Sequence, residues 1–261
     1  MALVCFVSAK GAPGVTLTAV GVAAAWPLAA GQRKLLLEAD PAGGSLAGRY
    51  QLGRQPGLVT LAAAARHGLT REDLWAHAQL LPGGLAVVVA PERADRTAPI
   101  LMSSATRLGG WLRDLPDVIT VADGGRLAPN TTSGLCRQGD LVVMVARPCT
   151  EQIHAGTALL DELADTGLSV GWLLIGRAPH TAVDVERVTG FAVIRTLSDD
   201  ARGASALTSG RVAGRFGQPP LVREIATFAA DLARSFTPTT RHDTQHAASQ
   251  AGDVSPVREA V

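Results

Sequence analysis

One short segment of the sequence has the composition of a phosphate-binding loop. Residues 8–17 read SAKGAPGVTL and lie between an apolar run, residues 2–7, and a segment typical of a helix, residues 14–30. Small residues in such a strand-to-helix turn let backbone amides approach an anion, and the start of a helix adds a favourable dipole. The hydroxyl of Thr16 could also bind a magnesium ion. A tight turn without a ligand is the alternative interpretation.

Two further segments place carboxylates after apolar runs. Glu38 and Asp40 end the run that begins at residue 34, and Asp123 follows the run 118–122. The carboxyl ends of parallel strands meet at one edge of a sheet, where α/β proteins bind ligands. A carboxylate at that edge, close to a phosphate loop, is what a magnesium site needs. Turn or capping roles for Glu38 and Asp40, and a turn beginning at Asp123, are the alternatives.

The rest of the chain predicts the sheet that would position these groups. Continuous rather than alternating apolar runs are typical of strands covered on both faces. The predicted strands are residues 2–7, 34–38, 85–90, 118–122, 141–146, 170–175 and 192–196, and the predicted helices include residues 14–30, 70–78, 151–164 and 220–236. This alternation indicates an α/β fold, with a mostly parallel twisted sheet flanked by helices on both faces in three layers.

Composition excludes several classes of protein. The 261 residues are 47% hydrophobic, which excludes a disordered chain, and their net charge of +1 argues against a dedicated nucleic-acid binder. Cys5, Cys136 and Cys149 form no CxxC pair and are expected to be reduced thiols. The sequence has no apolar stretch long enough to span a membrane and no segment that resembles a secretory signal, so we expect a cytoplasmic protein.

The chain is expected to fold as one domain over residues 1–236, with residues 237–261 as a polar, disordered tail. The segment 220–236 carries apolar residues on one face and arginines that are offset by acids. We therefore expect this helix to pack on the core rather than on a membrane. The locally basic segment 201–223 is only a weak indication of nonspecific DNA contact.

In this order the motifs resemble the ParA/MinD family of P-loop ATPases, which have a deviant Walker A loop. The family loop KGGxGK[ST] corresponds to residues 10–16, KGAPGVT, and its Walker B aspartate corresponds to Asp123. Residues 38–43, EADPAG, are similar to the segment that ends the family's second strand, and residues 197–201, LSDDA, are similar to its I-P-x-D turn. The resemblance spans residues 2–236 and implies a P-loop NTPase fold.

The resemblance also implies a site for ATP or ADP with Mg²⁺. Thr16 and Asp123 would organise the metal, and Asp40 would position the attacking water. Lys10, which in relatives reaches across a dimer to the partner's nucleotide, would act in catalysis, so a homodimer with a role in intracellular positioning or partitioning is expected. The expected nucleotide-binding residues are Lys10, Gly11, Ala12, Pro13, Gly14, Val15, Thr16 and Leu17.

Departures from the family pattern predict a degenerate member. Val15 stands where the family has its general P-loop lysine, Pro13 removes a backbone donor, and the family's adenine-contacting asparagine has no match. One lost hydrogen bond to a charged group, worth about 1.5–3 kcal/mol, would weaken ATP binding roughly ten- to hundredfold. Loss of the lysine should reduce hydrolysis more than binding, because stabilisation of the transition-state charge is worth ~10³–10⁵ in rate. We therefore expect weak or lost hydrolysis.

Other functions remain open. A scaffold or adaptor dimer for pilus, secretion or division machinery would keep the fold without binding nucleotide. An NAD-dependent oxidoreductase also uses a glycine-rich turn and an acid after the second strand, but the G-x-G-x-x-G spacing is absent. A reductase similar to the nitrogenase iron protein would need two thiolate ligands from each chain, and no cysteine stands between residues 6 and 135.

Overall fold

The computed structural model describes residues 2–11, 14–209 and 219–236, and the eight strands found among them form one sheet. The strand order is β3-β4-β2-β5-β1-β6-β7-β8, in which β3 and β4 are antiparallel and all other neighbours are parallel. The strands are β1 Ala2–Ser8, β2 Arg33–Glu38, β3 Gln79–Leu80, β4 Ala86–Val88, β5 Val118–Arg126, β6 Leu141–Ala146, β7 Val170–Ile175 and β8 Val193–Leu197. The predicted mostly parallel α/β sheet is confirmed.

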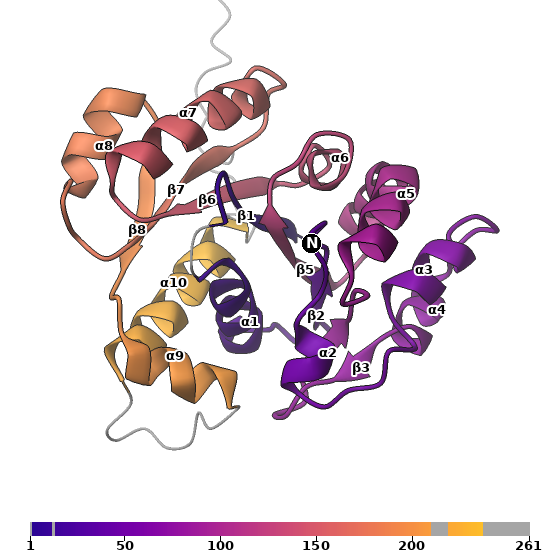
Figure 1. Cartoon of the computed structure of the whole chain (residues 1–261). Coiled ribbons are helices and arrows are strands. Elements are labelled where there is room, and N and C mark those ends of the chain that lie inside the picture. Colours follow the sequence, from indigo (N-terminus) through magenta and orange to yellow (C-terminus); the bar gives the residue numbers. More distant parts are fainter. Residues whose placement is uncertain (1, 12–13, 210–218, 237–261) are drawn as a thin grey trace, which may run out of the picture.

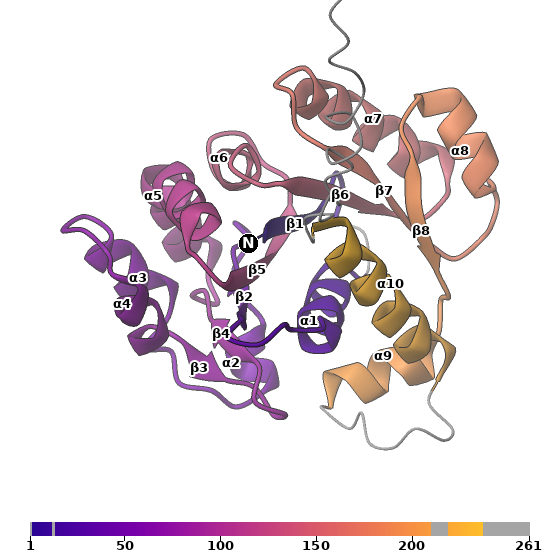
Figure 2. The ribbon, with the colours of Figure 1, turned by 180° about the vertical axis from the view of Figure 1, so that it is seen from behind.

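Helices cover both faces of the sheet and give it three layers (Figures 1 and 2). The helices are α1 Val15–Ala25, α2 Leu46–Arg49, α3 Leu58–Ala64, α4 Arg71–Ala76, α5 Ala94–Asp114, α6 Thr132–Cys136, α7 Thr150–Ala164, α8 Ala182–Thr189, α9 Ala201–Thr208 and α10 Pro220–Phe236. The helices α3 to α8 cover one face, and α1, α2, α9 and α10 cover the other. Side chains alternate along β1, so that Leu3 and Cys5 enter one core and Val4 and Phe6 enter the other.

Two elements beside the predicted loop differ from their predicted bounds. The helix α1 ends at Ala25 rather than at residue 30, because Pro27 disfavours helical backbone at Trp26, whose ψ is 121°. The strand β5 continues past residue 122 to Arg126, where it still pairs with Ser8 of β1. Asp123 therefore lies inside the strand, and Arg126 ends it.

Local capping signals set the starts of two helices. At α4 a capping box is present: Asp73 accepts a hydrogen bond from the Thr70 N–H at 2.7 Å, and the Thr70 hydroxyl accepts one from the Asp73 N–H at 3.3 Å. At α9 the carboxylate of Asp200, in the segment 197–201, accepts bonds from the first amides of the helix. This segment therefore forms the turn between β8 and α9.

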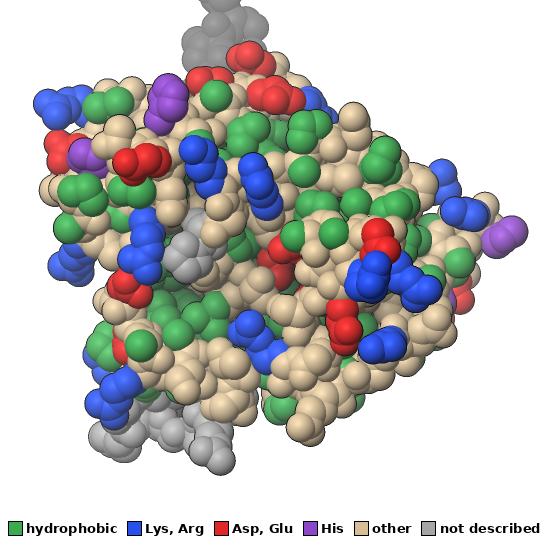
Figure 3. Space-filling model, viewed as in Figure 1, with side chains coloured by type: hydrophobic (Ala, Val, Ile, Leu, Met, Phe, Trp, Pro, Cys, Tyr) green, Lys and Arg blue, Asp and Glu red, His purple; other side chains and the backbone are tan. Residues whose placement is uncertain are grey.

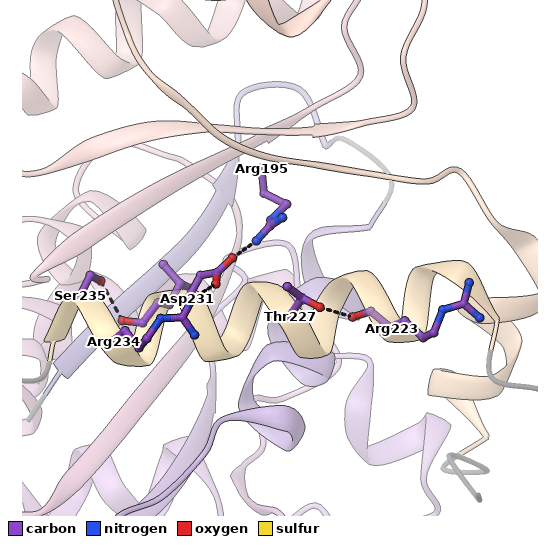
Figure 4. Close-up of polar contacts among 7 residues, drawn as sticks. Arg195, Arg223, Thr227, Asp231, Arg234 and Ser235 are labelled. Carbon is purple, nitrogen blue, oxygen red and sulfur yellow. Dashed lines mark hydrogen bonds and ion pairs between the residues drawn. The ribbon is translucent and has the colours of Figure 1, made fainter. Parts of the chain in front are cut away.

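The helix α10 packs on the sheet as predicted. Its buried residues are Leu221, Val222, Ile225, Phe228, Ala229 and Leu232. Asp231 on this helix pairs with Arg195 of β8 and with Arg234, and the Thr227 hydroxyl donates to the Arg223 carbonyl (Figure 4). Within the described ranges, the structure contains no helix that is both long and apolar enough to cross a membrane.

Some sequence predictions concern residues that the structure does not describe. The proposed tail 237–261, the loop positions Ala12 and Pro13, and two arginines of the basic segment, Arg211 and Arg215, lie outside the described residues.

Candidate functional site

A cleft of about 540 Å³ opens at the carboxyl edge of the sheet. The strands β2, β5 and β1 are neighbours, so the segments that follow them meet there. The cleft is lined by Ser8, Lys10, Gly11, Gly14, Val15, Thr16, Leu17, Asp40, Ala42, Arg49, Gly125, Arg126, Ala204 and Thr208. The face drawn in Figure 3 is hollowed near its middle, with basic side chains around the hollow and acidic side chains inside it.

The loop after β1 forms one wall of this cleft. Gly11 and Gly14 adopt φ angles of 69° and 106°, which are left-handed conformations that favour glycine. The Gly14 carbonyl accepts the Thr18 N–H at 2.8 Å, so the first turn of α1 closes directly behind the loop. The start of α1 therefore lies at the cleft, where the positive end of the helix dipole favours an anion. Every loop residue predicted from the sequence that the structure describes lines the cleft.

Val15 contributes an apolar surface to this wall. Its side chain is only 5% exposed and belongs to the buried cluster between the sheet and the layer of α1, α9 and α10. The P-loop pattern places at this position a lysine that reaches the phosphates. Here the position supplies packing energy and no charge.

Asp123 is buried beneath the loop. In the register of the sheet it lies between Phe6 of β1 and Glu38 of β2, and it is 1% exposed. The pKa of the Asp123 carboxyl is raised to about 7, chiefly by burial and also by the nearby charges of Glu38 and Asp40, while hydrogen bonds from Thr16 and the Gly125 amide act to lower it.

The side chains of Thr16 and Asp123, both proposed from the sequence as metal ligands, are joined by a hydrogen bond. A hydroxyl and a carboxylate are oxygen ligands of the kind that Mg²⁺ prefers, and Mg²⁺ usually keeps several waters beside one or two protein ligands. Among the described residues there is no cluster of three His, Cys, Asp or Glu that could enclose a metal ion. The pair at Thr16 and Asp123 therefore fits a phosphate-bound Mg²⁺ rather than a metal held by protein alone.

Asp40 lies on the cleft wall next to β5. Its Oδ1 accepts a hydrogen bond from the Ala42 amide at 2.8 Å, and burial raises the pKa of its carboxyl, while hydrogen bonds from the Ala42 and Arg126 amides lower it. A Cβ built on Gly125 would lie 2.0 Å from Cγ of Asp40, so the carboxylate rests against the bare backbone of β5.

Comparisons with known proteins find similarity in structure rather than in sequence. No family model matches the sequence, and no curated protein is significantly similar to it. A ParA family ATPase from Chlorobium tepidum TLS is similar with a TM-score of 0.73 and 19% identity, over 87% of this chain and 97% of that chain. The septum site-determining protein MinD from Pyrococcus horikoshii OT3, complexed with Mg-ADP, is similar with a TM-score of 0.69 and 13% identity. The match covers 88% of this chain and 95% of that chain.

The chain has the fold of the ParA and MinD ATPases. The resemblance seen in the sequence is therefore confirmed at the level of the fold. A complex of a Cyanothece McdA variant with ATP is also similar, with a TM-score of 0.69 and 15% identity over 92% of this chain and 99% of that chain.

Within this ParA/MinD fold, Glu38 has the capping role that the sequence left as an alternative. Its side chain is 1% exposed, Oε1 accepts the amides of Ser45 at 2.6 Å and Leu46 at 2.9 Å, and Oε2 accepts the Ala90 amide at 2.9 Å. Burial raises the pKa of this carboxyl, and the three amides lower it. Glu38 thus ties the start of α2 to the end of β4 and stays out of the cleft.

Two arginines of the cleft were not predicted from the sequence. Arg49 ends α2 and Arg126 ends β5, and both side chains are exposed in the cleft. Arg126 lies three positions after Asp123, so a sequence prediction that extended this strand to residue 126 would have placed Arg126 at the same edge of the sheet. No sequence signal identifies Arg49, because it reaches the cleft only through the position of α2 in the folded protein.

Proposed function

We propose that this chain binds a magnesium nucleoside triphosphate in the cleft, that it serves intracellular positioning or partitioning, and that its hydrolysis is weak or lost. The observation that carries the proposal is the meeting of Thr16 and the buried Asp123 at the start of α1, where the cleft opens at the carboxyl edge of the sheet. A triphosphate with Mg²⁺ is the common ligand class that matches all three features.

Each predicted residue has a distinct task in this proposal. The amides of the loop and of the first turn of α1 would hold the phosphates, and Thr16 and Asp123 would hold Mg²⁺, which would neutralise phosphate charge. Asp40 would orient the attacking water through its carboxylate. The Mg-ADP bound to MinD of Pyrococcus horikoshii and the ATP bound to the McdA variant of Cyanothece support this choice of ligand.

The weak hydrolysis follows from Val15. A buried isopropyl group cannot stabilise the charge that develops during phosphoryl transfer. Lys10 is exposed at the cleft, and we propose that in a homodimer it reaches the nucleotide of the second copy.

Calorimetric titration of the full chain with ATP, with and without Mg²⁺, tests this function. We expect binding that depends on Mg²⁺, and a turnover that is very slow and is lost in Asp40→Ala while binding persists. Asp161→Ala, which changes an exposed carboxylate of α7, is the control and should match the wild type. Absence of binding heat contradicts the proposed ligand, and rapid turnover contradicts the degenerate active site.

A scaffold or adaptor dimer that binds no nucleotide is the second candidate. The burial of Val15 favours it, because this position contributes apolar packing to the core and no charge to a phosphate. Light scattering separates the two functions. A dimer that forms only with Mg-ATP, and not in Lys10→Ala, supports the nucleotide-dependent protein, whereas a dimer that forms equally without nucleotide supports the scaffold.

A further inference from the structure

Three cationic side chains line the cleft from three different elements. Lys10 comes from the loop, Arg49 from the end of α2 and Arg126 from the end of β5. All three are exposed, and within the described part of the chain none of them lies within 4.0 Å of a carboxylate.

Some exposed arginines outside the cleft are paired with acids, whereas others, such as Arg66 and Arg107, have no carboxylate within 4.0 Å among the described residues. Arg93 binds Asp95 at 2.7 Å, and Arg137 binds Glu162 at 2.7 Å. In the cleft, by contrast, Asp40 is the one carboxylate that lines the wall among the described residues, and it accepts hydrogen bonds from backbone amides rather than from a guanidinium. The wall of the cleft therefore carries three cationic side chains and one carboxylate, and Lys10 also interacts electrostatically with Glu151.

We propose that Arg49 and Arg126 bind the phosphates of the nucleotide and supply the positive charge that Val15 does not. This inference rests on the proposed function and names the groups that make binding possible without the P-loop lysine. A guanidinium presents a planar fork of donors that fits phosphate oxygens in a bidentate manner. Arg126 stands beside Asp40, and Arg49 lines the cleft from the separate element α2, so the phosphates would lie between the loop and the two arginines.

Titration calorimetry of the full chain with Mg-ATP, Mg-ADP and inorganic tripolyphosphate tests this assignment in Arg49→Ala, Arg126→Ala and the double variant. Each single change is expected to weaken Mg-ATP binding about tenfold and the double change about a hundredfold, since one hydrogen bond to a charged group is worth about 1.5 kcal/mol or more. Tripolyphosphate binding should fall in the same way, because the arginines contact phosphates and not the base. Arg126→Lys keeps the charge without the fork and should lie between the wild type and Arg126→Ala.

The control replaces two exposed arginines away from the cleft, Arg66 and Arg107, and should bind as the wild type does. Melting temperatures of all variants are measured together with binding. If the double variant is unstable, the single variants and Arg126→Lys provide the test. If the wild type binds Mg-ATP and the arginine variants bind it equally well, this inference is wrong and the proposed function stands. If the wild type binds neither Mg-ATP nor tripolyphosphate, both are wrong.

Discussion

Asp40 rests directly on Gly125, across the boundary between the segment after β2 and the strand β5. A Cβ at Gly125 would lie 2.0 Å from Cγ of Asp40, and the φ of Gly125 is 55°, a left-handed value. Any other residue at position 125 would have to displace the carboxylate and also adopt a disfavoured backbone conformation. The position of Asp40 on the cleft wall thus depends on a residue that has no side chain.

Replacing Gly125 by alanine should therefore affect both stability and the cleft. We expect Gly125→Ala to lower the free energy of unfolding by about 2–4 kcal/mol, because the strained backbone and the clash add up. The matched control is Gly190→Ala, where φ is 74° but nothing lies within 4 Å of the new Cβ. Urea unfolding should show a loss of about 1 kcal/mol for the control. Equal losses in the two variants would show that Asp40 moves aside freely.

The buried Asp123 should make the ligand-free protein less stable as the pH rises. Its carboxyl has a pKa of about 7 in the folded protein, against an ordinary value of 3.8, so the folded state holds this proton more tightly than the unfolded state. The resulting stability is complete below pH 3.8 and is lost as the pH rises through 7. When the pH rises from 5 to 8, ionisation of this one group should lower the free energy of unfolding by about 2–3 kcal/mol.

Comparison with Asp123→Asn isolates that contribution, because Glu38 and Asp40 titrate in both proteins. Urea unfolding in the presence of EDTA measures the free energy of unfolding of both proteins. When the pH is raised from 5 to 8, this free energy should increase by about 2–3 kcal/mol in the variant relative to the wild type. Asp161→Asn, which changes an exposed side chain, should show no such gain. A difference between Asp123→Asn and wild type that is constant with pH would mean that Asp123 is ionised throughout.

Glu38 should act as a capping group for α2 and β4 rather than as part of the cleft. In Glu38→Gln the amide nitrogen cannot accept a hydrogen bond, so at least one of the three amides bound by Glu38 loses its partner. We expect a loss of about 1–3 kcal/mol in unfolding free energy at pH 8. Glu92→Gln, at an exposed ion pair with Arg54, should change stability by less than about 0.5 kcal/mol. A Glu38→Gln variant as stable as the wild type would contradict the capping role.

The sequence predicts the centre of the sheet well and its periphery less well. The runs that become β1, β2, β6 and β7 are continuous and apolar because both of their faces are covered, and their predicted bounds lie within one residue of the observed ones. The two-residue strand β3 is too short for any periodic signal. The end of β5 is hidden because Gly124 and Gly125 have the composition of a turn, although here they keep the chain in the strand.

The candidate site is predictable only where its residues belong to recognisable motifs at the ends of strands. The loop at residues 10–17 and the proposed metal-binding residues Thr16 and Asp123 follow from motifs at strand ends. Arg49 and Arg126 do not, because they come to line the same cleft as the loop only in the folded sheet, where β2 and β1 lie on either side of β5. The packing of Asp40 on Gly125 depends likewise on backbone angles that composition does not reveal.

The edge-to-face contact of Phe6 in β1 with Phe228 in α10, whose ring centroids lie 6.3 Å apart, joins the first strand to the last described helix. Contacts between such distant parts of a chain form late and slowly during folding. While the protein is being synthesised, the strand that leads into the loop lacks this partner until α10 has left the ribosome. A nascent chain halted before residue 220 therefore leaves the apolar side chains of β1 that face α10 without this cover.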